Sequence, residues 1–239
     1  MACGQCQSGA ANVFGERAAR RRLERYRAKG PGGTTRMLLD ALRAEGVAGL
    51  TLLDIGGGIG AIGFELLGAG VATATEVELS PAYVLAARDE AERQGVADRY
   101  ACRAGDFVAL ADDLPARGLR AAGPGPVHGD FVALADDLPA AGIVTLDRVI
   151  CRYPDMPALV GQSAVKAARL YGAVYPRDVW WVRAIRVVAN VGLRVTRNPL
   201  RLFIHRTAAV EAVVRGGGLV PLFHRDAGYW QVVVYGRPT

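Results

Sequence analysis

The chain has 239 residues, 51% of them hydrophobic and 22% charged, and its formal net charge is +6. The hydrophobic fraction excludes a globally disordered chain, and the length favours one α/β domain with appendages. The charge is uneven, because residues 1–36 carry eight Lys or Arg and two Glu, whereas the remaining residues are balanced. Four cysteines are too few for a disulfide scaffold, so we expect a cytoplasmic protein.

The basic N-terminal segment, residues 1–49, is expected to form a helical arm or lid beside the main domain. Phe14, Leu23 and Tyr26 recur at helical spacing, which predicts a helix held on the domain with its arginines in solvent. Contact of these arginines with phosphate groups is the alternative. The Cys3-x-x-Cys6 pair lacks a second ligand pair, so no metal site is expected.

Strands and helices are expected to alternate through most of the chain. Glycines and a proline at 30–33 break the first helix, and Thr34 or Thr35 is expected to cap a helix over Arg36–Glu45. Strand-like runs that alternate with helical ones predict a parallel sheet with helices on both faces. The expected strands are Leu50–Ile55, Ala72–Glu78, Arg99–Ala104, Gly142–Leu146 and Leu170–Tyr175, and helices are expected after the first strand and over Pro81–Gln94 and Ala158–Arg169.

The C-terminal end has a different pattern. Leu219–His224 and Trp230–Tyr235 are strand-like, and the five residues between them are too few for a crossover helix, so the two runs should pair antiparallel. We therefore predict an α/β domain over residues 50–239. Its expected fold is a Rossmann-like, doubly wound, mostly parallel seven-stranded sheet that ends in an antiparallel β-hairpin.

A glycine-rich turn, Leu52–Gly63 (LLDIGGGIGAIG), lies between the first strand and a helix N-terminus, where a ligand can approach bare backbone. Residues 58–63 match G-x-G-x-x-G, which is typical of NAD(P)-dependent oxidoreductases. Residues 54–60 also match D-x-G-x-G-x-G, the signature of class I S-adenosylmethionine-dependent methyltransferases. Asp54 favours the second interpretation, because a carboxylate at this position attracts an ammonium group and repels a pyrophosphate.

The motifs together resemble the bacterial class I methyltransferases, of the type related to magnesium-protoporphyrin O-methyltransferase. The resemblance runs from Thr51 to Tyr235 and ends in the expected hairpin. It is carried by LLDIGGGIG, ATEVELSPAY, AGDF, IVTLDRVICRYPD and LYGAVYPRDVWWVR. It implies that the chain binds S-adenosyl-L-methionine and methylates a small molecule.

The resemblance also implies a set of cofactor-binding residues. Asp54 would bind the amino group of the cofactor, Glu78 its ribose hydroxyls, and Asp106 its adenine. Phe107 would pack on the adenine ring. The full implied set is Asp54, Gly56, Gly58, Gly60, Glu78, Leu79, Asp106, Phe107 and Asp147.

One segment of this region is duplicated. GDFVALADDLPA occurs at 105–116 and again, without a change, at 129–140. Only the first copy directly follows an expected strand, so Asp106 and Phe107 are predicted to serve the cofactor and Asp130 and Phe131 are not. The surplus residues are expected to form a surface excursion, because the entropy cost of loop closure grows slowly with length.

The acceptor side of the site is less defined by the sequence. A sulfonium is a strong methyl donor, so positioning is the main requirement and a general base is optional. His205 and Tyr153 are the candidate bases, His205 because an imidazole takes a proton near neutral pH. Residues 179–206 hold six arginines and no acid and are expected to form a helical insert with a basic face.

Three interpretations of that basic face remain open. It could be a solvated surface, a lid over an apolar anionic acceptor, or a peripheral contact with a membrane. No run is long and apolar enough to span a bilayer. The apolar residues expected on the opposite side of the helix are Trp181, Ile185, Val188 and Val195, and the polar face comprises Arg183, Arg186, Asn190, Arg194, Arg197 and Arg201.

A different class of function stays open through the basic arm. The chain could be an RNA methyltransferase or an RNA-binding module. Against this, no additional RNA-binding domain is evident, and Leu146-Asp147-Arg148-Val149 stands where amino-methylating enzymes have an Asn/Asp-Pro-Pro-Tyr type of motif. Nucleic acid is therefore not the expected partner.

Overall fold

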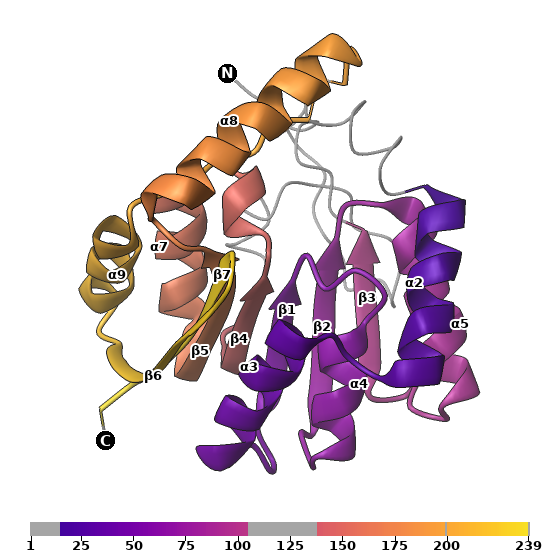
Figure 1. Cartoon of the computed structure of the whole chain (residues 1–239). Helices are drawn as coiled ribbons and strands as arrows, with labels where there is room; N and C mark the ends of the chain where they lie inside the picture. Colours follow the sequence, from indigo (N-terminus) through magenta and orange to yellow (C-terminus); the bar gives the residue numbers. More distant parts are fainter. Residues whose placement is uncertain (1–14, 105–137, 199, 239) are drawn as a thin grey trace, which may run out of the picture.

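The computed structural model describes residues 15–104, 138–198 and 200–238, and shows a single sheet with helices on both faces (Figure 1). The helices are α2 (Glu16–Lys29), α3 (Gly33–Ala44), α4 (Ala61–Gly68), α5 (Pro81–Arg93), α7 (Met156–Lys166), α8 (Trp180–Val195) and α9 (Thr207–Gly216). The strands are β1 (Thr51–Ile55), β2 (Thr73–Glu78), β3 (Tyr100–Ala104), β4 (Ala141–Asp147), β5 (Ala167–Pro176), β6 (Val220–Ala227) and β7 (Trp230–Gly236), and a short 3₁₀ turn covers Ile150–Arg152.

The sheet has the order β3-β2-β1-β4-β5-β7-β6. Strands β1 to β5 pair in parallel, and β7 runs antiparallel to both β5 and β6. Strand order reverses direction between β1 and β4, so the carboxyl ends of these two strands border the crevice where open α/β sheets bind ligands. The predicted fold class, including the terminal hairpin, is confirmed.

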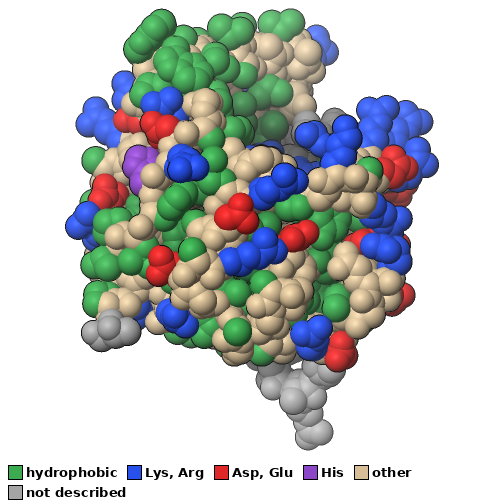
Figure 2. Space-filling model, turned by 60° about the horizontal axis from the view of Figure 1, so that its bottom comes forward, with side chains coloured by type: hydrophobic (Ala, Val, Ile, Leu, Met, Phe, Trp, Pro, Cys, Tyr) green, Lys and Arg blue, Asp and Glu red, His purple; other side chains and the backbone are tan. Residues whose placement is uncertain are grey.

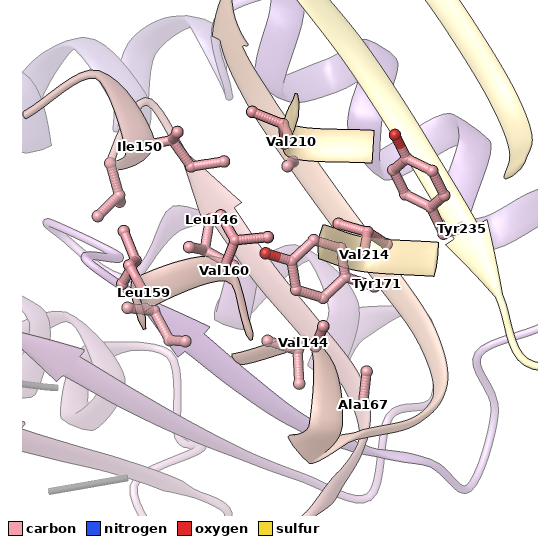
Figure 3. Packing of buried hydrophobic residues seen from close by; sticks show 14 of the residues in the cluster. Val144, Leu146, Ile150, Leu159, Val160, Ala167, Tyr171, Val210, Val214 and Tyr235 are labelled. Atoms are coloured by element: carbon pink, nitrogen blue, oxygen red, sulfur yellow. The ribbon is translucent and has the colours of Figure 1, made fainter. Parts of the chain in front are cut away.

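Two apolar layers hold the helices on the sheet. Successive side chains of β5 alternate between them, because neighbouring residues of a strand point to opposite faces. Tyr171 and Tyr175 lie in the layer beneath α7 and α9, and Leu170 and Val174 lie in the layer beneath α3 and α4. Figure 3 shows the first layer, in which Tyr171 also bonds to Ser163 at 2.9 Å.

The N-terminal helices both pack on the domain. Helix α2 buries Ala19 and Leu23, which contact the glycine loop and α5. Helix α3 covers β5 and β7. The expectation that Thr34 or Thr35 caps α3 is wrong, because the N-cap is Gly32 and both hydroxyls bond to residues at the end of β4 instead.

An ion pair joins α2 to α5. The Glu90 carboxylate is fully buried and accepts from Arg27 at 2.8 Å and from Arg93 at 2.6 Å. Gln94 donates a further bond to it. The hydrogen bond from Arg93 is the main cause that lowers the pKa of Glu90 to about 2, so the carboxylate stays charged in the folded protein.

Two predicted boundaries differ from the structure. Helix α7 starts at Met156 because Asp155 caps it and Pro157 occupies its first turn, where no backbone N–H is needed. It ends at Lys166, and the next three residues, predicted to be helical, start β5. Strand β6 extends to Ala227, past the predicted end at His224, because the hairpin turn is shorter than expected.

The exposure of the side chains of α8 differs in part from the expectation. The partly buried residues include Arg186 and Asn190, whereas Ile185, Val188 and Val195 are exposed. The helix ends at Val195. The predicted basic face is therefore in solvent at Arg183 and Arg194 and partly buried only at Arg186 and Asn190, and the outer surface of the helix also exposes several apolar residues.

The duplicated segment falls mostly outside the described residues. Strand β3 ends directly before the first copy, and β4 begins directly after the second copy, as predicted. Leu138, near the end of the second copy, is buried in the core and its carbonyl accepts from Lys166 at 2.7 Å. Cys3, Cys6, Phe14, Asp106, Phe107, Asp130 and Phe131 all lie outside the described residues.

Among the described residues, no helix is long and apolar enough to cross a membrane. Within the same ranges, no cluster of His, Cys, Asp and Glu has the arrangement of a metal site.

Candidate functional site

The glycine loop connects the carboxyl end of β1 to the N-terminus of α4. Gly56, Gly58 and Gly60 have φ values of 68°, 71° and 80°, in the region that favours glycine. A Cβ on Gly56 would lie 2.6 Å from a methyl carbon of Val149, and one on Gly60 would lie 2.9 Å from the Phe64 ring. The sequence therefore needs glycine both for the backbone conformation and for the space, and the loop presents bare backbone at the sheet edge.

Asp54 lies beneath this loop at the end of β1. Its side chain is buried, and Oδ1 accepts a hydrogen bond from Thr145 of β4 at 2.7 Å. Oδ2 has no hydrogen-bond partner among the described residues, and a Cβ on Gly57 would lie 2.5 Å from it. Burial raises the pKa of Asp54 to about 7. A buried acceptor atom without a donor, next to exposed backbone, fits an ammonium group.

Glu78 ends the neighbouring strand, β2. Its carboxylate accepts from the Gly58 N–H at 3.0 Å and from the Ser80 N–H at 2.8 Å, so it links the glycine loop to the start of α5. Burial raises the pKa of Glu78, and Arg152 opposes that shift. A carboxylate has about four acceptor positions, so the two backbone bonds leave room for two hydroxyl donors. Leu79 follows it and is partly buried.

A second buried acid, Glu76, was not identified from the sequence. It lies beside Asp54 in the register of β1 and β2, and Tyr100 of β3 donates a hydrogen bond to it. Its pKa is well above the ordinary value, mainly because of burial and then because of the Asp54 charge. The sequence did contain a signal for Glu76. Residues two apart in a strand share a face, so Glu76 points to the same side as Glu78.

The end of β4 is fastened to α3. The Asp147 carboxylate accepts from the Thr35 hydroxyl at 2.6 Å, and the Arg148 guanidinium donates to Thr34 at 2.5 Å. Arg148 has φ 64°, which is uncommon for a residue with a side chain, and its guanidinium lies over the Trp230 ring. Asp147 thus has a structural partner that sequence analysis did not foresee. Its assignment to the cofactor stays a prediction.

The imidazole of His205, one candidate base, bonds to the backbone carbonyl of Tyr153, the other. His205 Nε2 lies 3.0 Å from the Tyr153 carbonyl oxygen. A carbonyl oxygen only accepts, so Nε2 carries the proton and Nδ1 is the acceptor of the neutral ring. Burial lowers the pKa of His205, which keeps the ring neutral at physiological pH. Both residues lie at the edge of the sheet where the loop after β4 lies. A catalytic role for either residue stays a prediction.

Positive charge also faces this edge. Among the described residues, the buried Nε of Arg186 donates no hydrogen bond, whereas the buried Nε of Arg148 lies 3.5 Å from Oδ1 of Asp147. Asn190, one turn after Arg186, exchanges two hydrogen bonds with the backbone of Leu202, at 2.9 and 3.0 Å. The inner face of α8 is therefore fixed in place and brings a guanidinium toward the acceptor side of the site.

The fold resembles that of several solved structures. An O-methyltransferase family protein from Burkholderia thailandensis has a TM-score of 0.66 and 17% identity, over 97% of this chain and 63% of that one. Magnesium protoporphyrin IX methyltransferase from Synechocystis PCC 6803, with bound SAH, has a TM-score of 0.65 and 14% identity, over 98% and 100% of the two chains.

Sequence relatives are similar over a shorter region. The ribosomal protein L11 methyltransferase of Erwinia tasmaniensis is 39% identical over 66 residues, which make up 28% of this chain and 22% of that protein. The protein of the same name from Mannheimia succiniciproducens is 35% identical over 83 residues. The matched region therefore spans about a quarter of these relatives, and no protein-family model matches the chain. The chain has the fold of the class I S-adenosylmethionine-dependent methyltransferases.

Proposed function

We propose that this chain is an S-adenosylmethionine-dependent methyltransferase, with the cofactor held between the glycine loop, Asp54 and Glu78. The observation that carries the proposal is the buried Oδ2 of Asp54, which lacks a donor and lies against Gly57. The cofactor has an ammonium group that would supply this donor. A dinucleotide has no ammonium group to donate a hydrogen bond there, and its pyrophosphate would meet Asp54, Glu76 and Glu78.

When bound, the cofactor supplies a sulfonium methyl group, and the protein has to bind and orient the two reactants. Glu78 already fixes the glycine loop through the Gly58 N–H, so the loop does not need to reorganise around the ribose. On the acceptor side, His205 keeps one ring nitrogen as an acceptor for a proton. Its half-buried position at the loop after α8 suits a group that removes a proton from a hydroxyl or carboxyl acceptor.

We propose O-methylation of a small, apolar, anionic acceptor, of the type related to magnesium-protoporphyrin O-methyltransferase. The buried Nε group of Arg186 supports an anionic acceptor, because a buried donor without a partner is costly unless a ligand satisfies it. The likeness to the Synechocystis enzyme over nearly the whole length of both chains supports this type. Cys102 and Cys151 are free thiols, which is consistent with a cytoplasmic location.

A protein acceptor is the second candidate, because the sequence relatives are ribosomal protein L11 methyltransferases. An RNA acceptor would have to use the exposed arginines of α2. Both are distinguished from a small acceptor by transfer of a labelled methyl group, tested in parallel on phenols, carboxylic acids, porphyrins, ribosomal protein L11 and RNA. Label on L11 or on RNA, and on no small molecule, would overturn the proposed acceptor class but not the cofactor assignment.

The cofactor assignment is tested by calorimetry. We expect S-adenosylhomocysteine to bind and NADH and NADPH to give no heat. Binding of a dinucleotide without binding of S-adenosylhomocysteine would overturn the proposed function.

The acceptor site is tested by a pair of substitutions on one helix. Arg186→Ala should raise the acceptor KM and leave affinity for S-adenosylhomocysteine unchanged, because Arg186 faces the sheet edge. Arg194→Ala, on the exposed side of α8, is the matched control and should leave both unchanged. Equal acceptor kinetics for the Arg186 variant and the parent would remove Arg186 from the site.

A further inference from the structure

The outward face of α8 is an apolar surface that no described part of the chain covers. Only Val182 of this helix is buried, whereas Trp180, Val188 and Val195 are 80%, 72% and 78% exposed. We call this face the apolar ridge. It consists of Trp180, Ile185, Val187, Val188, Val191 and Val195.

The exposure of the apolar ridge does not come from a loosely attached helix. Asn190 bonds both ways to the Leu202 backbone, and the Phe203 N–H donates to the Cys151 carbonyl at 2.7 Å. Val182 is buried. The helix is therefore held in an orientation that buries Arg186 in part and keeps valines in solvent, the reverse of the usual arrangement of an amphipathic helix on a soluble domain.

Unpaired positive charge borders the apolar ridge. Residues 179–206 contain six arginines and no acid. Arg183 pairs with Asp178, whereas Arg194 and Arg197 are exposed and have no ion-pair partner among the described residues. Figure 2 shows hydrophobic side chains gathered at the end of the molecule where α8 lies, with Lys and Arg side chains at its margin.

Helix α8 lies at the periphery of the part of the chain that the structure describes. Figure 1 shows the helix as the outermost element at the end of the molecule toward which β1 to β5 point. Helix α2 starts at the same end, and its exposed residues there include Arg17, Arg20 and Arg21. An extended negative surface could therefore meet both the margin of the apolar ridge and the start of α2.

We propose that the apolar ridge adsorbs to an anionic lipid surface, with the valines in the outer part of the acyl region and the arginines among the headgroups. An apolar helix face with basic borders and Trp at one end is the pattern of helices that lie in a membrane interface. A second copy of the chain is a poorer partner. In a symmetric dimer the two facing surfaces would carry the same charge, and residues 179–206 hold six arginines and no acid to compensate.

The test is flotation of the full-length protein with vesicles. Vesicles of phosphatidylcholine and phosphatidylglycerol in equal parts should carry the protein upward, and vesicles of phosphatidylcholine alone should carry much less. The variant Val188→Asp/Val191→Asp should reduce the bound fraction by about tenfold, because it places two charges in the acyl region. Arg194→Gln/Arg197→Gln should remove mainly the preference for the anionic lipid.

A control with the same change in charge, Leu85→Asp/Val165→Asp, alters two exposed apolar residues on α5 and α7 and should bind vesicles as the parent does. All variants should keep the parent's affinity for S-adenosylhomocysteine, which shows that they fold. Failure of the parent to bind anionic vesicles, or equal loss in the control, would overturn the proposal. The proposal would also be overturned if the parent were a dimer and the Val188→Asp/Val191→Asp variant a monomer, because the apolar ridge would then bind a second copy of the chain.

Discussion

The buried carboxyl of Asp54 makes a specific prediction about the pH dependence of cofactor binding. In the ligand-free protein its pKa is about 7, so about half of the molecules carry a proton there at neutral pH. An ammonium group next to Oδ2 favours the charged form, so binding requires loss of that proton. Each pH unit below the pKa then costs about 1.4 kcal/mol, and the Kd for S-adenosylhomocysteine should rise about tenfold between roughly pH 8 and pH 6.

The sign follows from the direction of the shift. A carboxyl with a raised pKa is protonated below that value, so affinity is highest above about pH 7 and declines as the pH falls through it. Calorimetry in buffers of different ionisation enthalpy measures the number of protons released on binding. That number should approach one well below pH 7. Asp54→Asn should lower affinity at high pH by about 1.5–3 kcal/mol, the loss of a charged hydrogen-bond acceptor, and should flatten the profile.

Neighbouring acids supply the control for this experiment. Glu76→Gln removes the other buried carboxyl that lies against Gly57. It should keep most of the pH dependence, since Glu76 already accepts a hydrogen bond from Tyr100. If Asp54→Asn retains the tenfold change and Glu76→Gln loses it, the titrating group has been misassigned and the reasoning from the unpaired Oδ2 is refuted.

Three further outcomes are expected. Glu78→Ala should weaken binding of S-adenosylhomocysteine by about 1–3 kcal/mol, because it removes the acceptor of the ribose hydroxyls, and unchanged affinity in calorimetry would exclude that role. Glu90→Gln should lower the free energy of unfolding in urea by about 1–3 kcal/mol at neutral pH. The pKa of Glu90 is lowered from 4.5 to about 2 in the folded protein, so its stabilising contribution should decline as the pH falls below about 4.5 and be lost as the pH falls through about 2. A variant that remains less stable than the parent at the acid end of this range would argue against an ionic cause. Asp106→Ala should reduce affinity for S-adenosylhomocysteine and Asp130→Ala should not, and the opposite pattern would assign the adenine to the second copy.

The sheet was predictable because its signals are local. The alternation of apolar runs with helical ones defines the parallel strands, and the five residues between the last two strands allow only an antiparallel turn. Asp54 and the three glycines were predictable because the motif requires them in one order along the chain. The loop has no space for Cβ atoms at Gly56 and Gly60, and the role of these residues in cofactor binding stays a prediction.

Features that depend on register or on long-range contacts were not predictable in this way. The contact of Glu76 with Tyr100 needs the pairing of β2 with β3. Thr34 and Thr35 reach the end of β4 across more than a hundred residues of sequence, so a local capping role was the natural interpretation. For α8, periodicity defined two faces but did not show that Arg186 and Asn190 would be partly buried while valines stay in solvent.

The positions of β3 and β4 relative to the two copies of GDFVALADDLPA have a consequence for the history of this chain. Strand β3 ends one residue before the first copy, and β4 starts one residue after the second. Removing residues 105–128 or residues 117–140 therefore leaves the same polypeptide, in which a single copy connects the two strands. Its twelve residues are enough for a crossover between parallel strands. Reversion to one copy would leave every described strand and helix with its sequence unchanged, so the length of this connection is free to vary without altering the sheet around the glycine loop.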